Sequence, residues 1–286
     1  MTIGRVGLLV STNHLREKLA SVWRQNRLGK DLRVLDSSYD FDDDKTDGYK
    51  DFYKQGHIPS SVYFNPQNCS KSTALIPFDL PDPHCFTDYI QSLGVSPDTH
   101  VVLYDRLNSD AALRAWWLLR LYGHRNTSVL DGGLRKWVRD GYPVTTEEPA
   151  VERGDFKSRL DNSLMKNYHH MKDSVNSQKE EIIDARGPGA FNKVIQTGKG
   201  EIKNFIPGAK NIPYRSLFNE DGTFKAVDEI KELFNKQNVD LSRPLIAMCY
   251  RGITGCALSA AAELLGKHDT PLYYGSWKEW SGRMAE

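Results

Sequence analysis

The residue of this sequence with the clearest chemical potential is Cys249, which stands in a short loop. The apolar stretch 244–247 before it begins with proline and predicts a buried strand. Residues 255–265 after the loop read GCALSAAAELL and predict a helix. A thiol between a strand and a helix start meets backbone N–H groups and the positive end of the helix dipole, which favour a thiolate. The local pattern leaves two interpretations open, a reactive thiolate or a small buried core residue.

Three chemistries suit a thiolate held by backbone N–H groups: phosphate ester cleavage, acyl transfer and sulfur transfer. Cysteine phosphatases need an arginine after five intervening residues, but Gly255 stands at that position. Acyl transfer normally needs a nearby histidine base, and none occurs close to Cys249 in the sequence. Sulfur transfer needs a thiolate that accepts a sulfane sulfur as a persulfide, and a cation for the anionic donor. The loop therefore favours sulfur transfer.

Two arginines are candidates for that cation. Arg251 lies in the loop itself, and Arg186 follows the apolar strand segment 182–184, so it is expected on the same sheet edge as the cysteine. Each has an alternative interpretation: Arg186 pairs with Asp184, or Arg251 faces solvent. Thr254 has two possible roles as well, since its hydroxyl suits either a bond to sulfur or a helix cap.

The elements that position these residues occur twice in the chain. Four segments of the first half reappear in the second in the same order, with offsets between 143 residues (from 137 to 280) and 148 residues (from 36 to 184). The pairs are LRVLD at 32–36 with EIID at 181–184, HIPS at 57–60 with FIPG at 205–208, VVLYD at 101–105 with LIAMC at 245–249, and DGGLRKW at 131–137 with YGSWKEW at 274–280. Four pairs in register indicate two copies of one domain. Asp105 then aligns with Cys249, so we expect only the second copy to be catalytic.

Strand and helix segments alternate in both copies, which predicts an α/β fold with a parallel sheet flanked by helices. The first domain is expected over 1–144 and the second over 158–286, joined by a polar linker at 145–157. Ligands of such sheets bind beyond the carboxyl ends of the strands, where Cys249 is placed.

The composition of the chain argues against nucleic-acid binding and against a membrane span. The 286 residues carry a formal net charge of +1, so no basic footprint for nucleic acid is present, and no apolar run approaches the ~20 residues of a membrane span. The four cysteines show no C-x-x-C spacing, and we expect free thiols in a reducing compartment, the cytoplasm or the mitochondrion. No metal or organic cofactor is expected.

Taken together, the motifs make the chain similar to the tandem-domain rhodanese family of thiosulfate and 3-mercaptopyruvate sulfurtransferases. The resemblance extends from about residue 8 to residue 283. It rests on HIP at 57–59, RAWWLLRLYGH at 114–124, VLDGGLRKW at 129–137, IPGA at 206–209, the cysteine loop, and GSWKEW at 275–280. It implies a persulfide on Cys249, an inactive first domain, and a thiol acceptor such as thioredoxin or glutathione, or cyanide. The substrate-binding residues it implies are Arg186, Tyr250, Arg251, Gly252, Ile253 and Thr254.

The sequence departs from both branches of this family at the two residues after the cysteine. Thiosulfate enzymes resemble Arg-Lys there and mercaptopyruvate enzymes Gly-Ser or Gly-Thr, whereas this chain has Tyr250 and Arg251. Phe78 falls near an expected histidine of the hydroxyl relay, and Lys193 near an expected second arginine. One cation without a hydroxyl favours thiosulfate slightly. The alternative is a persulfide carrier, sensor or scaffold without efficient turnover.

Overall fold

The computed structural model describes residues 7–43, 45–106, 109–197 and 200–285. The chain divides into two compact units. The first consists of Met1–Ser70, Pro81–Asp161 and Asn219–Phe224. The second consists of Lys71–Leu80, Asn162–Phe218 and Lys225–Glu286. Two short segments therefore belong to a different unit from the residues that flank them in the sequence: 71–80 belong to the second unit and 219–224 to the first.

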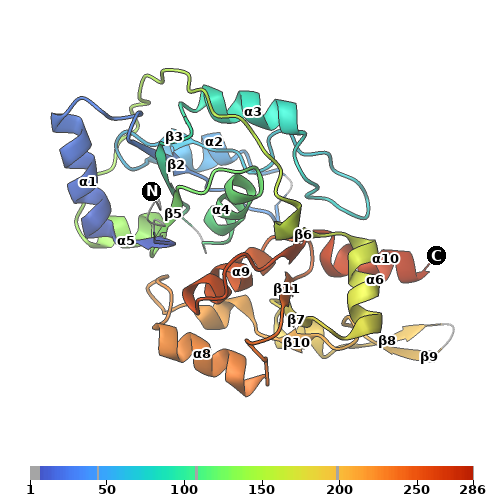
Figure 1. Cartoon of the computed structure of the whole chain (residues 1–286). Coiled ribbons are helices and arrows are strands. Elements are labelled where there is room, and N and C mark those ends of the chain that lie inside the picture. Colours follow the sequence, from blue (N-terminus) through green and yellow to red (C-terminus); the bar gives the residue numbers. More distant parts are fainter. Residues whose placement is uncertain (1–6, 44, 107–108, 198–199, 286) are drawn as a thin grey trace. The chain divides into compact units, whose positions relative to one another are not determined.

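The first unit contains a five-stranded sheet in which every neighbouring pair is parallel (Figure 1). In spatial order its strands are β1 (Leu9–Val10), β5 (Thr127–Leu130), β4 (His100–Tyr104), β2 (Leu32–Asp36) and β3 (Val62–Tyr63). All residues of β2, β4 and β5 are buried, as expected for parallel strands covered on both faces.

Helices flank this sheet. They are α1 (Thr12–Arg24), α2 (Gly48–Asp51), α3 (Pro83–Ser92), α4 (Asp110–Leu121) and α5 (Gly133–Arg139), with the 3₁₀ turn η1 (Tyr53–Gln55). Local sequence explains where they begin: the Ser11 hydroxyl caps α1, and the Asp82 carboxylate caps α3 just before a proline at its first position. The helix α4 packs on β4 and β5 and is buried from Ala111 to its end.

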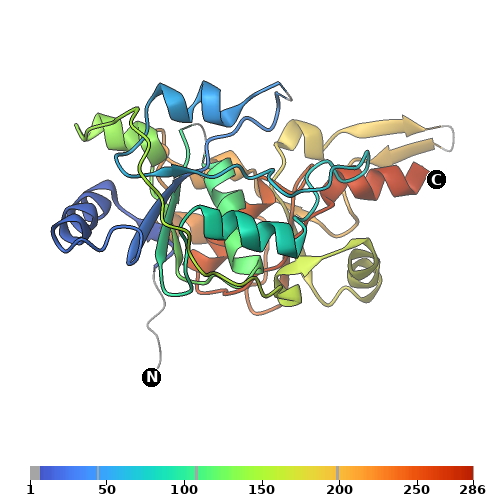
Figure 2. The same ribbon diagram turned by 90° about the horizontal axis from the view of Figure 1, so that it is seen from above.

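The second unit repeats this arrangement. Its parallel sheet has the order β10 (Lys210–Asn211), β7 (Glu181–Asp184), β11 (Leu245–Met248), β12 (Leu272–Tyr273) and β6 (Met165–Lys166). Its helices are α6 (Tyr168–Ser177), α7 (Pro188–Phe191), α8 (Val227–Lys236), α9 (Gly255–Leu264) and α10 (Ser276–Ala285), with the 3₁₀ turns η2 (Asn162–Leu164) and η3 (Tyr214–Leu217). An added antiparallel hairpin, β8 (Val194–Thr197) and β9 (Gly200–Lys203), projects from this unit near α10 (Figure 2).

The two strand orders correspond position by position. In each sheet a central strand, β4 or β11, lies between the equivalents β2 or β7 on one side and β5 or β12 on the other. A helix buried on almost all faces, α4 or α9, follows the central strand. The predicted α/β fold with two copies of one parallel-sheet domain is confirmed.

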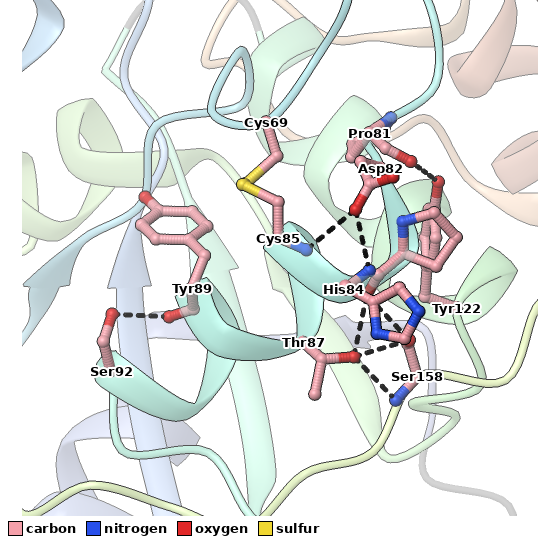
Figure 3. Close-up of a disulfide and its surroundings, with 11 residues drawn as sticks. Cys69, Pro81, Asp82, His84, Cys85, Thr87, Tyr89, Ser92, Tyr122 and Ser158 are labelled. Carbon is pink, nitrogen blue, oxygen red and sulfur yellow. Dashed lines mark hydrogen bonds between the residues drawn. A yellow bond between two sulfur atoms is a disulfide. The ribbon is translucent and has the colours of Figure 1, made fainter.

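The cysteine prediction needs a correction. Cys69 and Cys85 form a disulfide (Figure 3), and the other two cysteines, Cys249 and Cys256, do not. The two half-cystines are 16 residues apart in the chain, and no sequence spacing rule pairs them. They meet because the chain folds back at the start of α3. Within the described residues, no helix has the length and apolar character needed to cross a membrane.

Candidate functional site

The loop that joins β11 to α9 holds the sulfur of Cys249 in a polar setting. The side chain is 2% exposed, and the Gly252 N–H donates to Sγ at 3.1 Å. The hydroxyl of Ser276 lies 3.9 Å from the same sulfur and accepts the Cys249 N–H at 3.1 Å. The Gly252 N–H and the start of α9 therefore face the sulfur, while the Ser276 hydroxyl donates to the Tyr273 carbonyl at 2.8 Å.

Two glycines shape this loop. Gly252 has a φ of +82°, and a Cβ there would lie 2.2 Å from the carbonyl oxygen of Tyr274. Only glycine fits this turn, and the turn directs the Gly252 N–H to the sulfur. At Gly255 a Cβ would lie 2.6 Å from the Leu272 side chain. The packing at position 255 leaves no room for the arginine of a cysteine phosphatase, in agreement with the sequence argument.

Arg186 is buried and bound to Asp184. Its Nε and Nη2 lie 2.9 Å and 2.6 Å from Asp184 Oδ2, and Nη2 also donates to the Asn204 carbonyl at 2.8 Å. The guanidinium carbon lies 4.8 Å from the ring centre of Trp277. Burial raises the pKa of the Asp184 carboxyl, and the adjacent guanidinium opposes that rise. The salt bridge considered as the alternative role of Arg186 is thus formed.

The same arginine also lines a cavity of about 420 Å³ in the second unit. The cavity wall combines small, aromatic and polar side chains with two basic ones. Its residues are Ala185, Arg186, Gly187, Ala190, Lys193, Asn204, Tyr214, Tyr250, Thr254, Trp277 and Ser281. Three of the predicted site residues, Arg186, Tyr250 and Thr254, therefore meet at one cavity beside the cysteine loop. Thr254 precedes α9 and makes no capping bond through its side chain.

The remaining predicted residues lie elsewhere in the loop. The Arg251 guanidinium carbon lies 5.1 Å from the ring centre of Phe78, a residue of the segment 71–80 that belongs to the second unit. Ile253 is 5% exposed and belongs to the apolar core, so its contribution is packing. Tyr250 is 46% exposed. Within the described chain, no three His, Cys, Asp or Glu side chains come together as a metal site would require.

Sequence reasoning missed Ser276 and Trp277 as site residues. Ser276 is fully buried, and the Trp277 N–H donates to the Cys249 carbonyl at 3.0 Å. Both belong to the GSW motif, which follows β12, the strand paired with β11. That pairing brings the motif to the cysteine loop, and the available signal was the GSWKEW motif at 275–280, one of those that carry the family resemblance.

Comparison with known proteins agrees with this geometry. The profile of the rhodanese-like domain matches twice, at residues 22–140 and 167–283. A thiosulfate sulfurtransferase of Gallus gallus is 40% identical over 96% of this chain and 93% of its own length. A 3-mercaptopyruvate sulfurtransferase of Homo sapiens is 36% identical over 95% of this chain and 91% of its own length.

Solved structures show the same architecture. The crystal structure of SseA from Escherichia coli, described among the 3-mercaptopyruvate sulfotransferases with a rhodanese fold, is 28% identical. It superposes with a TM-score of 0.83 over 95% of this chain and 99% of its own. Two family matches, two sheets of one topology and full-length relatives lead to one conclusion: the chain belongs to the rhodanese family and is a sulfurtransferase.

Proposed function

We propose that Cys249 carries the transferred sulfur as a persulfide. The observation that supports this most directly is the Gly252 N–H bond to Sγ at 3.1 Å, at the start of α9 and next to a cavity with basic side chains. The N–H bond stabilises the thiolate before the reaction. It also stabilises the inner sulfur when that atom becomes the leaving group in the second step.

The two half-reactions balance without a cofactor. With thiosulfate, the Cys249 thiolate attacks the outer sulfur, the S–S bond breaks, and sulfite leaves with the electron pair. With 3-mercaptopyruvate, a C–S bond breaks instead, and pyruvate leaves as its enolate and takes up a proton. Cyanide or a thiolate then attacks the outer sulfur of the persulfide, and the Cys249 thiolate is regenerated.

We favour thiosulfate as the donor, followed by 3-mercaptopyruvate. Relatives of both types match nearly the whole chain. Tyr250 and Arg251 provide a cation and no small hydroxyl after the cysteine, and Lys193 adds a second cation at the cavity. Two cations suit a dianionic donor better than a monocarboxylate. If Arg186 binds the donor, its guanidinium must contact the donor as well as Asp184.

The acceptor is proposed to be a small thiol or a dithiol protein of the glutathione or thioredoxin kind. Such acceptors are kept reduced in the cytoplasm and in mitochondria, where we propose that the protein works. We assign the reaction to the second domain, 158–286, and a supporting role without catalysis to the first domain, 1–144, beyond the linker 145–157.

The test is formation of thiocyanate from cyanide with each donor in turn. Wild type should turn over, and Cys249→Ser should not, while Cys256→Ala serves as the matched control because that thiol is also buried and outside the disulfide. Wild type that makes no thiocyanate from either donor, or an active Cys249→Ser protein, would contradict the proposal.

A second candidate is a persulfide carrier without efficient turnover, favoured by the departure at positions 250 and 251 from both branches of the family. Mass spectrometry after incubation with donor separates the two. One added sulfur atom on Cys249 that persists in the presence of cyanide would identify the carrier, and an adduct removed by cyanide would identify the enzyme.

A further inference from the structure

The Cys69–Cys85 disulfide closes the base of the chain segment between them, because it joins the two ends of that segment (Figure 3). Cys85 lies in the first turn of α3 and is exposed, whereas Cys69 is half-buried and has a φ of +66°, in the left-handed region. Next to the disulfide, the Asp82 N–H donates to the Cys69 carbonyl at 3.1 Å, and Ser70 pairs with Pro81 in an antiparallel bridge. The chain thus leaves and re-enters the first unit at one point.

Between these two ends, residues 71–80 belong to the second unit. They form no helix or strand, and residues 71–74 are exposed. Their hydrogen bonds include short-range ones, such as the Thr73 N–H to the Ile76 carbonyl at 3.0 Å and the Ser72 hydroxyl to the Pro77 carbonyl at 2.7 Å. Such a segment has little regular structure of its own, so closure at its base restricts its conformations strongly.

Two side chains of the segment contact other residues of the second unit. Phe78 lies against Arg251, with 5.1 Å from the guanidinium carbon to the ring centre. Leu75 rests on Gly282 of α10, where a Cβ would lie 2.3 Å from Leu75 Cδ2. Arg251 is two residues after the sulfur nucleophile. The position of Phe78 therefore influences the direction of the loop cation in the proposed reaction.

From this arrangement we infer that the Cys69–Cys85 disulfide is a redox modification site whose reductant is a dithiol. Its state controls how firmly residues 71–80 hold Phe78 against Arg251. This inference depends on the proposed function in one respect: Arg251 is the cation that binds the anionic donor. When the disulfide is formed, the closed segment holds Arg251 in place. When the disulfide is reduced, the segment loosens and the affinity of the protein for the donor falls.

The chemical step balances with the reductant alone. A thiolate of the dithiol attacks one sulfur of the disulfide, and the other cysteine leaves as a thiolate. The second thiol of the reductant resolves the mixed disulfide. The net result is two cysteine thiols on the protein and one disulfide in the oxidised reductant. Cys85 is exposed and Cys69 is half-buried, so the sulfur of Cys85 is the accessible point of attack and Cys69 leaves as the thiolate. A dithiol acceptor of sulfur would belong to the same chemical class as this reductant.

The experiment compares oxidised and reduced full-length protein. Wild type is treated with dithiothreitol, freed of it by gel filtration, and assayed with thiosulfate and cyanide, while alkylation and mass spectrometry count the thiols. We expect the KM for thiosulfate to rise about two- to fivefold on reduction, with a smaller change in kcat. Cys69→Ser/Cys85→Ser should show the raised KM with and without dithiothreitol.

A second readout does not depend on activity. Lys71 is exposed in the closed segment, and trypsin should cleave after it several-fold faster in the reduced protein, as followed by peptide mapping. Phe78→Leu, which keeps both cysteines, should raise the KM in both redox states without opening the base of the segment.

Any of three results would overturn the inference: a disulfide that dithiothreitol does not reduce, equal KM and equal cleavage in both states, or a double variant that still responds to the reductant. Absence of thiocyanate in both states would instead count against the proposed function. The cleavage after Lys71 would then still decide whether the disulfide controls the segment.

Discussion

The loops after the two central strands use the same device with different atoms. In the second unit, Sγ of Cys249 accepts the Gly252 N–H at 3.1 Å. In the first unit, the carboxylate of Asp105 accepts the Ser109 N–H at 3.0 Å and the Ala112 N–H at 2.8 Å. Both copies therefore place a hydrogen-bond-accepting group, a carboxylate or a thiol sulfur, at the start of a buried helix. Only the second unit has a thiol at this position, and that thiol is the nucleophile of the proposed reaction.

The strands beside the central strands, β2 and β7, both end in a buried aspartate, but the partners of the two aspartates differ. Asp36 ends β2 beside Tyr104, and Asp184 ends β7 beside Met248, and burial raises the pKa of both carboxyls. Two residues after Asp184 comes Arg186, which binds it through two nitrogens. The residue two after Asp36 is Ser38, whose N–H and hydroxyl donate to Asp36 Oδ1.

The loops after the two central strands also differ in their ionisable groups. The pKa of Asp110, at the start of α4, is raised to about 7 by burial and by the adjacent Asp105. The loop of the first unit thus brings two carboxyl groups together beside Arg106, where the loop of the second unit has a thiol and Arg251. These carboxyl groups disfavour an anionic sulfur donor, so we expect the proposed reaction only in the second unit.

The largest effect should come from moving the nucleophile between the units. In a Cys249→Ser chain, Asp105→Cys should restore no sulfur transfer, and thiocyanate formation should stay at least about a thousandfold below wild type. The reason is that Asp110 adds a carboxyl group beside the new thiol and that Ser38, two residues after Asp36, stands where the second unit has Arg186. Activity clearly above the Cys249→Ser background would show that the cradle alone is sufficient.

A stability comparison tests the paired carboxylates. Arg186→Leu leaves Asp184 buried without its cation and should lower the free energy of unfolding by about 3–5 kcal/mol, whereas Ser38→Ala in the first unit should cost about 1 kcal/mol. Both losses of unfolding free energy can be measured by urea unfolding, with hydrogen exchange of the β7 and β2 amides as the probe of each unit. Asp184→Asn in the Arg186→Leu background should recover part of the loss. Equal losses in the two units would mean that the arginine is not what distinguishes them.

Acid should weaken the first unit before the second. Burial lowers the pKa of His100 to about 3, with a contribution from Lys18, and that of His124 to about 4. The unfolded state takes up protons below pH ~6.5 while these folded side chains stay neutral, so stability falls as pH decreases from about 6.5 toward 4, by up to about 1.4 kcal/mol per pH unit for each histidine. The described histidines of the second unit, 169, 170 and 268, are exposed.

Hydrogen exchange at pH 7 and pH 5 checks this order, because it reports on the strands of each unit separately. His100→Gln should flatten the pH dependence of β4 and leave β11 unchanged. Earlier acid opening of β11 than of β4 would reverse the expected order.

The smallest effect concerns the loop cation. Arg251→Gln should raise the KM for thiosulfate about tenfold, by loss of one charge-assisted contact, with a lesser change in kcat. Arg251→Lys should recover part of the affinity, and Arg106→Gln in the first unit serves as the control outside the reacting loop. An unchanged KM would mean that the cavity cations, Arg186 and Lys193, serve the donor without Arg251.

Much of the fold could be read from local pattern. Apolar runs at 101–104 and 245–248 predict buried strands, and the recurring motifs reveal the duplication, because these signals lie in consecutive residues. The partner of Arg186 could only be given as two alternatives. Whether a guanidinium faces a donor or Asp184 depends on burial, which no local pattern measures.

The amino-acid pattern alone predicts two α/β copies, one with a cysteine and one with an aspartate after the central strand. The contacts of Ser276 and Trp277 with Cys249, and the bond between Cys69 and Cys85, became visible only in the folded chain. The tertiary structure also showed that Phe78 lies against Arg251. The physical reason is the same in all three cases: these contacts join residues far apart in the chain, and they exist only once parallel strands pair and the segment at 71–80 folds back.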